Sequence, residues 1–341
     1  MSAHIPRRAV LESLSGLGLL AALAACTTVT PTSATPGTST PGQSSPPSSP
    51  PPTPSSTGTE PSATPTPSAS PLPSAPLAAG HVNALVIGSD SRSEALDGSS
   101  DVLTLVQLTA DRTRVNLVSI ARDSAVPLPG GGQGKINAVY AGRGPAAAAA
   151  SVSSLLGGLP IHYTLETGFS RFIRISELLG GFTVTNRQAS NSIGITFPAG
   201  PLTLRGEPAL LYVRERKGLA NGDLDRTERH RAALTGILAR LHELAIKDFG
   251  GVAAMLPALV SNVRMSGLTA EQAAGMLPLL TTLTPDAVSS VMVPVKGFGM
   301  VGGASVDIVN TSRTAELAAA LARGDLAPYI AKYGTSNAPT G

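Results

Sequence analysis

The chain has one cysteine, no tryptophan and few aromatic residues, and charged residues make up only 14% of its 341 positions. A single cysteine excludes an internal disulfide. The scarcity of aromatic side chains argues against a large cleft in which sugar rings stack. The formal net charge of +3 is small, and basic residues are not interleaved with aromatic ones as in RNA-binding domains. We therefore expect no nucleic-acid partner.

The first 26 residues have the pattern of an export signal. Arg7 and Arg8 give a positive start, and the apolar run from Leu14 to Ala25 is too short to span a bilayer. The run ends in Leu-Ala-Ala-Cys, which resembles a bacterial lipobox. We therefore expect a lipid on Cys26 that anchors the protein to the membrane surface, at the outer face of the cytoplasmic membrane. The paired arginines leave the export route open between the twin-arginine and general secretory pathways.

Residues 27–80 are almost entirely Pro, Ser, Thr, Ala and Gly. A segment of this composition cannot bury enough apolar surface to offset the entropy lost on ordering, which predicts a disordered linker. In a polyproline conformation it would reach on the order of 150 Å. The remainder of the chain is long enough for one sizeable core. We expect a folded domain over residues 81–330 and a flexible tail over 331–341.

The folded part mixes strand-like and helix-like segments without a strict βαβ rhythm. Segments 102–108 and 114–120 flank a short polar turn and predict an antiparallel hairpin. The other expected strands are 83–88, 210–213 and 289–295. The expected helices are 144–156, 169–179, 225–244, 251–262, 270–283 and 312–323. This mixture predicts an α/β sandwich, in which a mixed central sheet is covered by helices on both faces.

Positive charge is concentrated in residues 212–231, YVRERKGLANGDLDRTERHR. The cationic positions are Arg214, Arg216, Lys217, Arg226, Arg229, His230 and Arg231. Several of them fall at the start of an expected helix, where the backbone already presents positive charge, which favours a bound phosphate or pyrophosphate. The alternatives are a solvated basic face, internal partners in Asp223 and Asp225, and an ordinary core position for His230.

Four further charged residues flank the ends of the first three expected strands. If these strands run up, down and up, the four meet at one edge of the sheet: Asp90, Arg92, Asp101 and Arg122. Two carboxylates among arginines suit a pyrophosphate held jointly by Mg²⁺ and guanidinium groups. Taken singly, each residue has an ordinary alternative as a turn cap, a solvated loop residue, a strand-edge charge or, for Arg122 with Asp123, a local ion pair.

Seven segments resemble the LytR-CpsA-Psr family in their order and spacing. They are GSDSR, SSDVLTLVQL, VNLVSIARD, KINAVYAGRGP, ELLGGFTV, LRGEPALLYVRERK and GDLDRTERHR. The resemblance covers residues 82–325. It implies an extracytoplasmic enzyme that transfers a glycopolymer from a polyprenyl-pyrophosphate carrier to peptidoglycan.

The resemblance also implies roles for individual residues. Asp90 and Asp101 would hold Mg²⁺ as the cofactor and, with Arg122 and Arg226, would carry catalysis. The residues expected to contact the pyrophosphate are Arg92, Arg122, Lys135, Arg214, Arg216, Arg226, Arg229 and His230. The sequence departs from the family pattern at Ala121, where proline is usual, at Ser99, where arginine is frequent, and at His230, where glutamine is usual.

An acceptor hydroxyl would attack the phosphorus that carries the glycopolymer, and either Asp90 or Asp123 would serve as the general base. Helices 144–158 and 169–181 would wall a tunnel for the polyprenyl chain, with ordinary core packing as the alternative. Two rival functions use the same residues. One is a hydrolase that splits the pyrophosphate with water as the acceptor, and the other is a non-catalytic module that binds the lipid carrier or regulates its use.

Overall fold

The computed structural model describes residues 79–91, 95–96 and 98–340 of the chain. The expected export signal, Cys26, most of the expected linker and Arg92 lie outside these residues. Within the described ranges, no helix is both long enough and apolar enough to cross a membrane.

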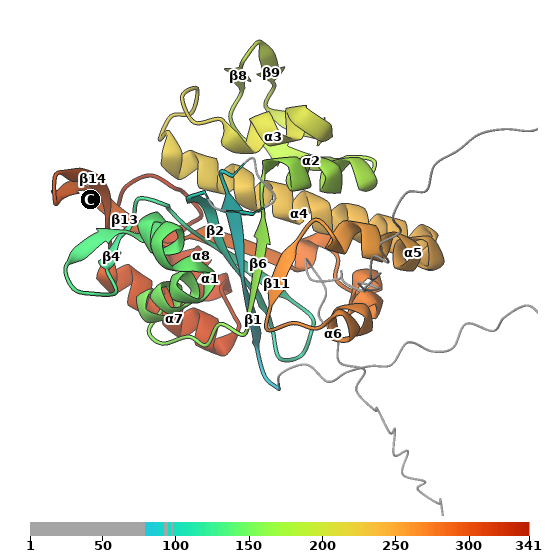
Figure 1. Cartoon of the computed structure of the whole chain (residues 1–341), viewed down its shortest axis with the longest axis horizontal. Helices are drawn as coiled ribbons and strands as arrows, with labels where there is room; N and C mark the ends of the chain where they lie inside the picture. The colour runs from blue at the N-terminus through green and yellow to red at the C-terminus, as the bar shows by residue number, and fades with distance from the viewer. Residues whose placement is uncertain (1–78, 92–94, 97, 341) are drawn as a thin grey trace, which may run out of the picture. The chain divides into compact units, whose positions relative to one another are not determined.

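A six-stranded mixed sheet forms the centre of the fold (Figure 1). Its strands, in spatial order, are β11 (Arg264–Ser266), β6 (Tyr163–Thr167), β1 (Val82–Ser89), β2 (Ser100–Leu108), β3 (Val115–Ile120) and β12 (Val288–Met292). Strands β2 and β3 form the antiparallel hairpin that the short polar turn predicts, and β1 pairs antiparallel with β2 to complete a meander. Strand β6 runs parallel to β1 and β12 runs parallel to β3, so the expectation of a mixed sheet is confirmed.

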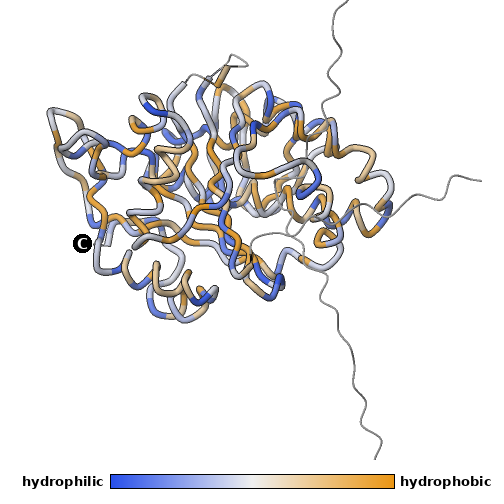
Figure 2. Tube along the Cα trace, turned by 60° about the horizontal axis from the view of Figure 1, so that its bottom comes forward, coloured by the Kyte–Doolittle hydropathy of each residue, from blue (hydrophilic) through white to orange (hydrophobic). Residues whose placement is uncertain are grey.

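Helices cover both faces of this sheet, which confirms the α/β sandwich. Along β1, Val82, Ala84 and Val86 face one core while Leu85 and Ile87 face the other, as the two-residue period of a strand requires. The first core is closed by α2 (Phe169–Leu178), α3 (Gly206–Arg214), α4 (Asp223–Lys247), α5 (Phe249–Val260) and α6 (Ala270–Gly275). The second is closed by α1 (Ile136–Leu155), α7 (Thr311–Arg323) and α8 (Ala327–Tyr333). Figure 2 shows the apolar residues concentrated along the central strands.

Four two-stranded antiparallel sheets and two 3₁₀ helices complete the fold of the described residues. The sheets pair β4 (Ala125–Pro127) with β5 (Gln133–Lys135), β7 (Phe182–Asn186) with β10 (Gly200–Leu204), β8 (Ser190–Ser192) with β9 (Ile195–Phe197), and β13 (Val295–Val301) with β14 (Ala304–Val309). The 3₁₀ helices are η1 (Leu277–Thr281) and η2 (Pro285–Ala287).

The strand expected over residues 210–213 is wrong, because these residues lie in helix α3. Leu210, Leu211, Tyr212 and Val213 are all buried. A short run of buried apolar residues does not show by its periodicity whether it is a strand or a helix.

Helix α1 begins at Ile136 rather than at residue 144. Gly144 has a φ of 78°, which interrupts the helix immediately before Pro145. The sequence signal at these two residues therefore marks a kink inside the helix instead of its start.

The segment that the sequence predicts to be a flexible tail makes specific contacts. Residues 331–333 complete α8. Asn337 is buried, and its Oδ1 accepts a hydrogen bond of 3.0 Å from Arg231 Nη2. The backbone N–H of Thr340 donates to the carbonyl oxygen of Val295 at 2.8 Å. The end of the described chain thus packs against α4 and β13.

Candidate active site

The meander brings the charged residues that follow β1, precede β2 and follow β3 to one edge of the sheet. Ser89 pairs with Ser100 across β1 and β2, and Leu103 pairs with Ile120 across β2 and β3. Asp101 and Arg122 therefore face each other, and Arg122 Nη1 donates to Asp101 Oδ1 at 2.6 Å.

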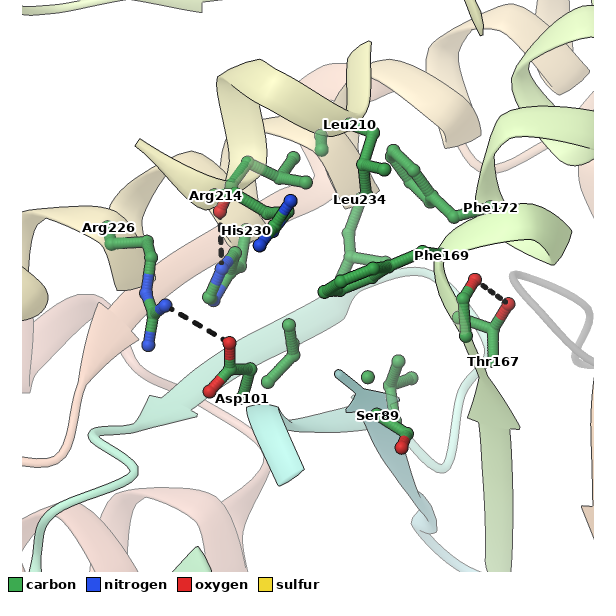
Figure 3. Close-up of a pocket in the computed structure, with 16 residues that line it drawn as sticks. Ser89, Asp101, Thr167, Phe169, Phe172, Leu210, Arg214, Arg226, His230 and Leu234 are labelled. Atoms are coloured by element: carbon green, nitrogen blue, oxygen red, sulfur yellow. Dashed lines mark hydrogen bonds and ion pairs between the residues drawn. The ribbon is translucent and has the colours of Figure 1, made fainter. Parts of the chain in front are cut away.

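The start of α4 reaches the same edge from the other half of the chain. Arg226 Nη1 lies 3.3 Å from Asp101 Oδ2 (Figure 3), and Arg226 Nη2 lies 2.9 Å from Asp223 Oδ1. Asp223 Oδ1 is also 3.5 Å from Nε of Arg122. Arg226 is only 4% exposed, so these carboxylates compensate a buried charge. The two cationic stretches of the sequence thus meet at Asp101 and Asp223.

A polar cavity of about 380 Å³ opens over this cluster. It is lined by Asp90, Asp101, Arg122, Phe169, Arg214, Arg216 and Arg226. Four of these side chains are arginines and two are carboxylates, so the lining carries a net positive charge. Guanidinium groups bind phosphate oxygens through paired hydrogen bonds, which suits this cavity to an anion with several phosphate oxygens.

Asp101 stays ionised despite its burial. Burial by itself raises the pKa of this carboxyl, but Arg226 and Arg122 outweigh that effect and hold its pKa below the ordinary value of 3.8. The carboxylate therefore holds the two arginines in place.

A second, apolar cavity of about 90 Å³, whose lining Figure 3 shows, adjoins the polar one. The two share Asp101, Phe169, Arg214 and Arg226 in their linings. The apolar part lies between the sheet and helices α2, α3 and α4, and its lining includes Val86, Val102, Phe172, Leu210, Val213, His230, Ala233 and Leu234. The two adjoining cavities therefore have different linings, one cationic and the other apolar.

Of the two helices expected to wall a tunnel, α2 lines the apolar cavity and α1 does not. Phe169 and Phe172 of α2 point into it (Figure 3). Helix α1 packs on the opposite face of the sheet, so its assignment to this wall is wrong. Its alanines instead allow close packing in the second core.

Asp90 lines the polar cavity and accepts a hydrogen bond of 2.6 Å from the backbone N–H of Ser99. A Cβ at Gly98 would lie 2.1 Å from Asp90 Oδ1, so this turn requires glycine. Lys135 is absent from the lining, and its Nζ lies 3.0 Å from Asp123 Oδ1.

Arg229 points away from the cluster. Its guanidinium carbon lies 4.4 Å from the centre of the Tyr212 ring, and its Nη2 donates to the carbonyl oxygen of Gln188 and to Ser190 Oγ. Asp225 accepts hydrogen bonds from Asn221 and Gln188 rather than from an arginine. Of the two aspartates proposed as internal partners, only Asp223 therefore has an arginine partner in the cluster.

Asp90 and Asp101 are the two carboxylates of the polar cavity that could hold a Mg²⁺ ion. The described residues contain no group of three or more His, Cys, Asp or Glu side chains able to hold a metal. Mg²⁺, however, commonly binds one or two carboxylates and takes its other ligands from substrate phosphates and water. Asp90 and Asp101 line the same cavity and supply the two carboxylates that this mode requires.

His230 lines the apolar cavity as a neutral side chain. Its Nε2 lies 2.9 Å from the carbonyl oxygen of Val213, and burial together with the charge of Arg226 lowers its pKa from 6.5 to about 3. Below pH ~6.5 the unfolded chain binds a proton at this position and the folded protein does not, so acid destabilises the fold.

Substituting His230→Gln is expected to remove this destabilisation of the fold by acid. Between pH ~6.5 and ~5 the wild type should lose about 2 kcal/mol more of its free energy of unfolding than the variant. Urea unfolding at both pH values measures the difference, and equal pH slopes in the two proteins would contradict the buried neutral state.

The sequence does not reveal one further residue of this region, Asp307, which lies near Arg122. Its backbone N–H donates to the carbonyl oxygen of Asp123 at 2.9 Å, and the side chain is buried. Burial and the nearby charges of Asp123 and Asp223 raise its pKa from 3.8 to about 6. Nothing near it in the sequence signals this position, because a hairpin about 180 residues after Asp123 carries it there.

Because the raised pKa favours the protonated form, the Asp307 contribution to stability falls as pH rises from ~4 to ~6. Over that interval we expect the free energy of unfolding to fall by on the order of 2–3 kcal/mol more in the wild type than in Asp307→Asn. Chemical unfolding at the two pH values tests this expectation. A variant that loses as much stability as the wild type would show that Asp307 ionises freely in the fold.

Comparisons with known proteins show the family and the fold of the chain. The model of the LytR_cpsA_psr family matches residues 55–323, more than half of the chain. The chain belongs to this family. The resemblance of the seven sequence segments is therefore confirmed, and all the residues that line the polar cavity of this LytR_cpsA_psr protein except Phe169 come from those segments.

Two relatives are described as polyisoprenyl-teichoic acid–peptidoglycan teichoic acid transferase TagU. That of Oceanobacillus iheyensis is 34% identical over 159 residues, which cover 45% of this chain and 49% of the relative. That of Bacillus cereus strain AH820 is 32% identical over 192 residues, which cover 56% of this chain and 62% of the relative. The matched region thus spans between 49% and 62% of these two proteins.

Solved structures share the fold. B. subtilis TagV superposes with a TM-score of 0.60 at 22% identity, covering 73% of this chain and 99% of TagV. The structure of TagT bound to LI-WTA gives a TM-score of 0.57 at 25% identity, covering 71% of this chain and 89% of TagT.

Proposed function

We propose that this LytR_cpsA_psr protein transfers a glycopolymer from a polyprenyl-pyrophosphate carrier to peptidoglycan. The observation that carries the proposal is the adjacency of an arginine-lined cavity and an apolar cavity, which have four lining residues in common. A polyprenyl pyrophosphate has the same two parts, a multiply charged head and a long hydrocarbon chain. The relatives named as teichoic acid transferases support the transfer to peptidoglycan.

In this proposal the arginines bind the head of the carrier. Arg122 and Arg226 approach from the sheet edge and from α4, while Arg214 and Arg216 approach from the end of α3. Arg214 also lies over the ring of Phe169, with 4.2 Å between its guanidinium carbon and the ring centre. This contact holds a cation at the boundary between the polar and apolar parts, where the first phosphate would join the hydrocarbon chain.

The chemistry is a phosphoryl transfer. A hydroxyl of a peptidoglycan sugar attacks the phosphorus that carries the glycopolymer, and its bond to polyprenyl phosphate breaks. The arginines bind the negative charge that develops on the departing phosphate, so that catalysis consists mainly of positioning and electrostatic stabilisation. When bound between Asp90 and Asp101, Mg²⁺ would add further positive charge beside the diphosphate.

The carboxylates of the cluster have different surroundings. Asp123 is paired with Lys135 and does not line the polar cavity. Asp90 lines it, which favours Asp90 over Asp123 as the group that meets the incoming hydroxyl. A lipid on Cys26 followed by the long linker would hold this chemistry outside the cell, at the membrane that contains the carrier.

Incubating the purified protein with a polyprenyl-pyrophosphate sugar and peptidoglycan tests the proposal. We expect sugar phosphate covalently linked to peptidoglycan, and loss of that product when EDTA removes divalent ions. Free phosphorylated sugar as the only product would instead indicate a hydrolase. Retention of the lipid without any turnover would indicate a binding or regulatory module.

A further inference from the structure

Glu215 lies between two arginines of the polar cavity but outside the cavity lining. Arg214 and Arg216 both line the cavity, whereas Glu215 does not. Helix α3 ends at Arg214, and the backbone at Glu215 is extended, with a φ of −65° and a ψ of 133°. In extended backbone a side chain and its neighbours point to opposite sides. The backbone therefore couples the orientation of Glu215 to that of the arginines beside it.

Glu215 is a buried carboxylate that closes the turn 215–218. Its Oε1 accepts a hydrogen bond of 3.0 Å from the backbone N–H of Gly218. Ser192 of β8 and two further backbone N–H groups of the turn also hydrogen-bond to the carboxylate. Burial raises the pKa of Glu215, but these hydrogen bonds outweigh that effect and hold the pKa below its ordinary value of 4.5. Glu215 is thus ionised at neutral pH and joins the turn to β8.

The turn packs closely on β8, and Arg229 holds β8 in place. A Cβ at Gly218 would lie only 3.2 Å from Cβ of Ser190, so the turn and the strand are in direct contact. Arg229 Nη2 donates to Ser190 Oγ at 2.8 Å, and the Arg229 side chain is buried against the ring of Tyr212. Arg229, which the sequence predicts to contact the pyrophosphate, therefore supports the strand against which the turn packs.

Arg216 is the arginine of the cavity that depends most on its backbone for position. Its side chain is 48% exposed, and its Nη1 lies 3.8 Å from Asp223 Oδ1. By contrast, Arg122 and Arg226 have carboxylate oxygens at 2.6 and 2.9 Å, and Arg214 lies over an aromatic ring. Ordering an exposed arginine on binding costs side-chain entropy, so a fixed backbone beneath it favours affinity.

We propose that Glu215 is a positioning residue that holds Arg216 at the polar cavity, where Arg216 binds the diphosphate head of the carrier. Glu215 acts through the backbone of its turn, since it lies outside the cavity lining. The inference rests on the proposed function, because it takes the head of a polyprenyl pyrophosphate as the anion. The charge of a nearby carboxylate by itself weakens anion binding, so the charge and the positioning effect of Glu215 have opposite signs.

Two substitutions of equal charge separate these effects. Glu215→Gln keeps an oxygen that accepts the hydrogen bonds of the turn, whereas Glu215→Ala removes the acceptor, and both remove the negative charge. Binding of geranylgeranyl pyrophosphate to the full-length protein is measured by isothermal titration calorimetry in the presence of Mg²⁺. We expect Glu215→Ala to bind about tenfold more weakly than Glu215→Gln. Equal affinities in the two variants would overturn the proposal.

The same two substitutions in an Arg216→Ala background show whether Glu215 acts through this arginine. Once Arg216 is absent, Glu215→Ala and Glu215→Gln should bind geranylgeranyl pyrophosphate with equal affinity, as a double-mutant cycle requires of two coupled residues. A difference that persists would assign the effect of Glu215→Ala to a general disturbance or to misfolding, and would overturn the proposal.

Glu228 provides a matched control. It pairs with Arg187 at 2.7 Å and lies outside the lining of the polar cavity. Glu228→Ala and Glu228→Gln should bind the probe equally, and a tenfold difference here would also overturn the proposal. The titration needs neither an acceptor nor turnover. A wild type that binds the probe but links no sugar phosphate to peptidoglycan refutes the transfer alone, whereas a wild type that does not bind the probe refutes both.

Discussion

Arg226→Ala is expected to abolish transfer and also to destabilise the fold. The side chain is 4% exposed and pairs with Asp101 and Asp223. Its removal leaves two partly buried carboxylates without their main cation, which typically costs about 3–5 kcal/mol. Turnover of a polyprenyl-pyrophosphate sugar, measured together with urea unfolding, reports both effects.

Arg122→Ala separates the two effects. Its side chain is 21% exposed, and Asp101 keeps Arg226 as a partner when Arg122 is absent. We expect turnover to fall by about 10²–10³-fold, as when one group that stabilises transition-state charge is lost. The stability cost should be clearly smaller than for Arg226→Ala. Normal turnover in both variants would refute the assignment of the site.

Ala233→Phe is expected to block the apolar cavity without harming the fold. Ala233 lines this cavity from α4 and is buried, so a phenyl group at this position would occupy space inside the cavity. The ring would exclude the hydrocarbon chain and weaken carrier binding by about a hundredfold or more, since roughly 3 kcal/mol of apolar burial is lost. Filling the space should leave the unfolding midpoint unchanged or raise it.

Ala239→Phe supplies a control on the same helix, because Ala239 is half-buried and lies outside the cavity lining. Binding is measured with a fluorescent polyprenyl phosphate. Unchanged affinity in Ala233→Phe would show that the chain occupies another surface. Equal losses in both variants would attribute the effect to a general disturbance of α4.

The first three strands illustrate what the sequence predicts well. The short connection between β2 and β3 predicts an antiparallel hairpin, and once β1 also runs antiparallel to β2 the three strands determine which strand ends share an edge. The meeting of Asp101 and Arg122 follows from that topology alone. The change from leucines to cations along α4 likewise indicates that its start enters a polar environment.

The errors arise where tertiary packing decides. Residues 210–213 read as a strand because their apolar run has no visible period, yet packing among α2, α4 and the sheet makes them helical. The sequence also led to the wrong prediction that α1 walls the tunnel for the polyprenyl chain, because nothing in the sequence of α1 specifies which face of the sheet this helix covers. Arg229 and Arg226 are three positions apart on one helix, and only the packing of Tyr212 shows that Arg229 turns away.

The charges show the same limit. Asp223 and Asp225 are equivalent in the sequence as partners for the arginines. In the structure Asp223 pairs with Arg226, whereas Asp225 accepts hydrogen bonds from Asn221 and Gln188. A two-residue step along a helix turns a side chain by about 200°, so the orientation of α4 against the sheet determines which aspartate serves the site.

A crystal structure of the protein with a non-transferable polyprenyl-pyrophosphate sugar tests the central claim most directly. The account predicts density for the two phosphates between Arg122 and Arg226, with the hydrocarbon chain running past Phe172 and Leu234. Density for the diphosphate away from both arginines, or for the chain outside the apolar cavity, would contradict it.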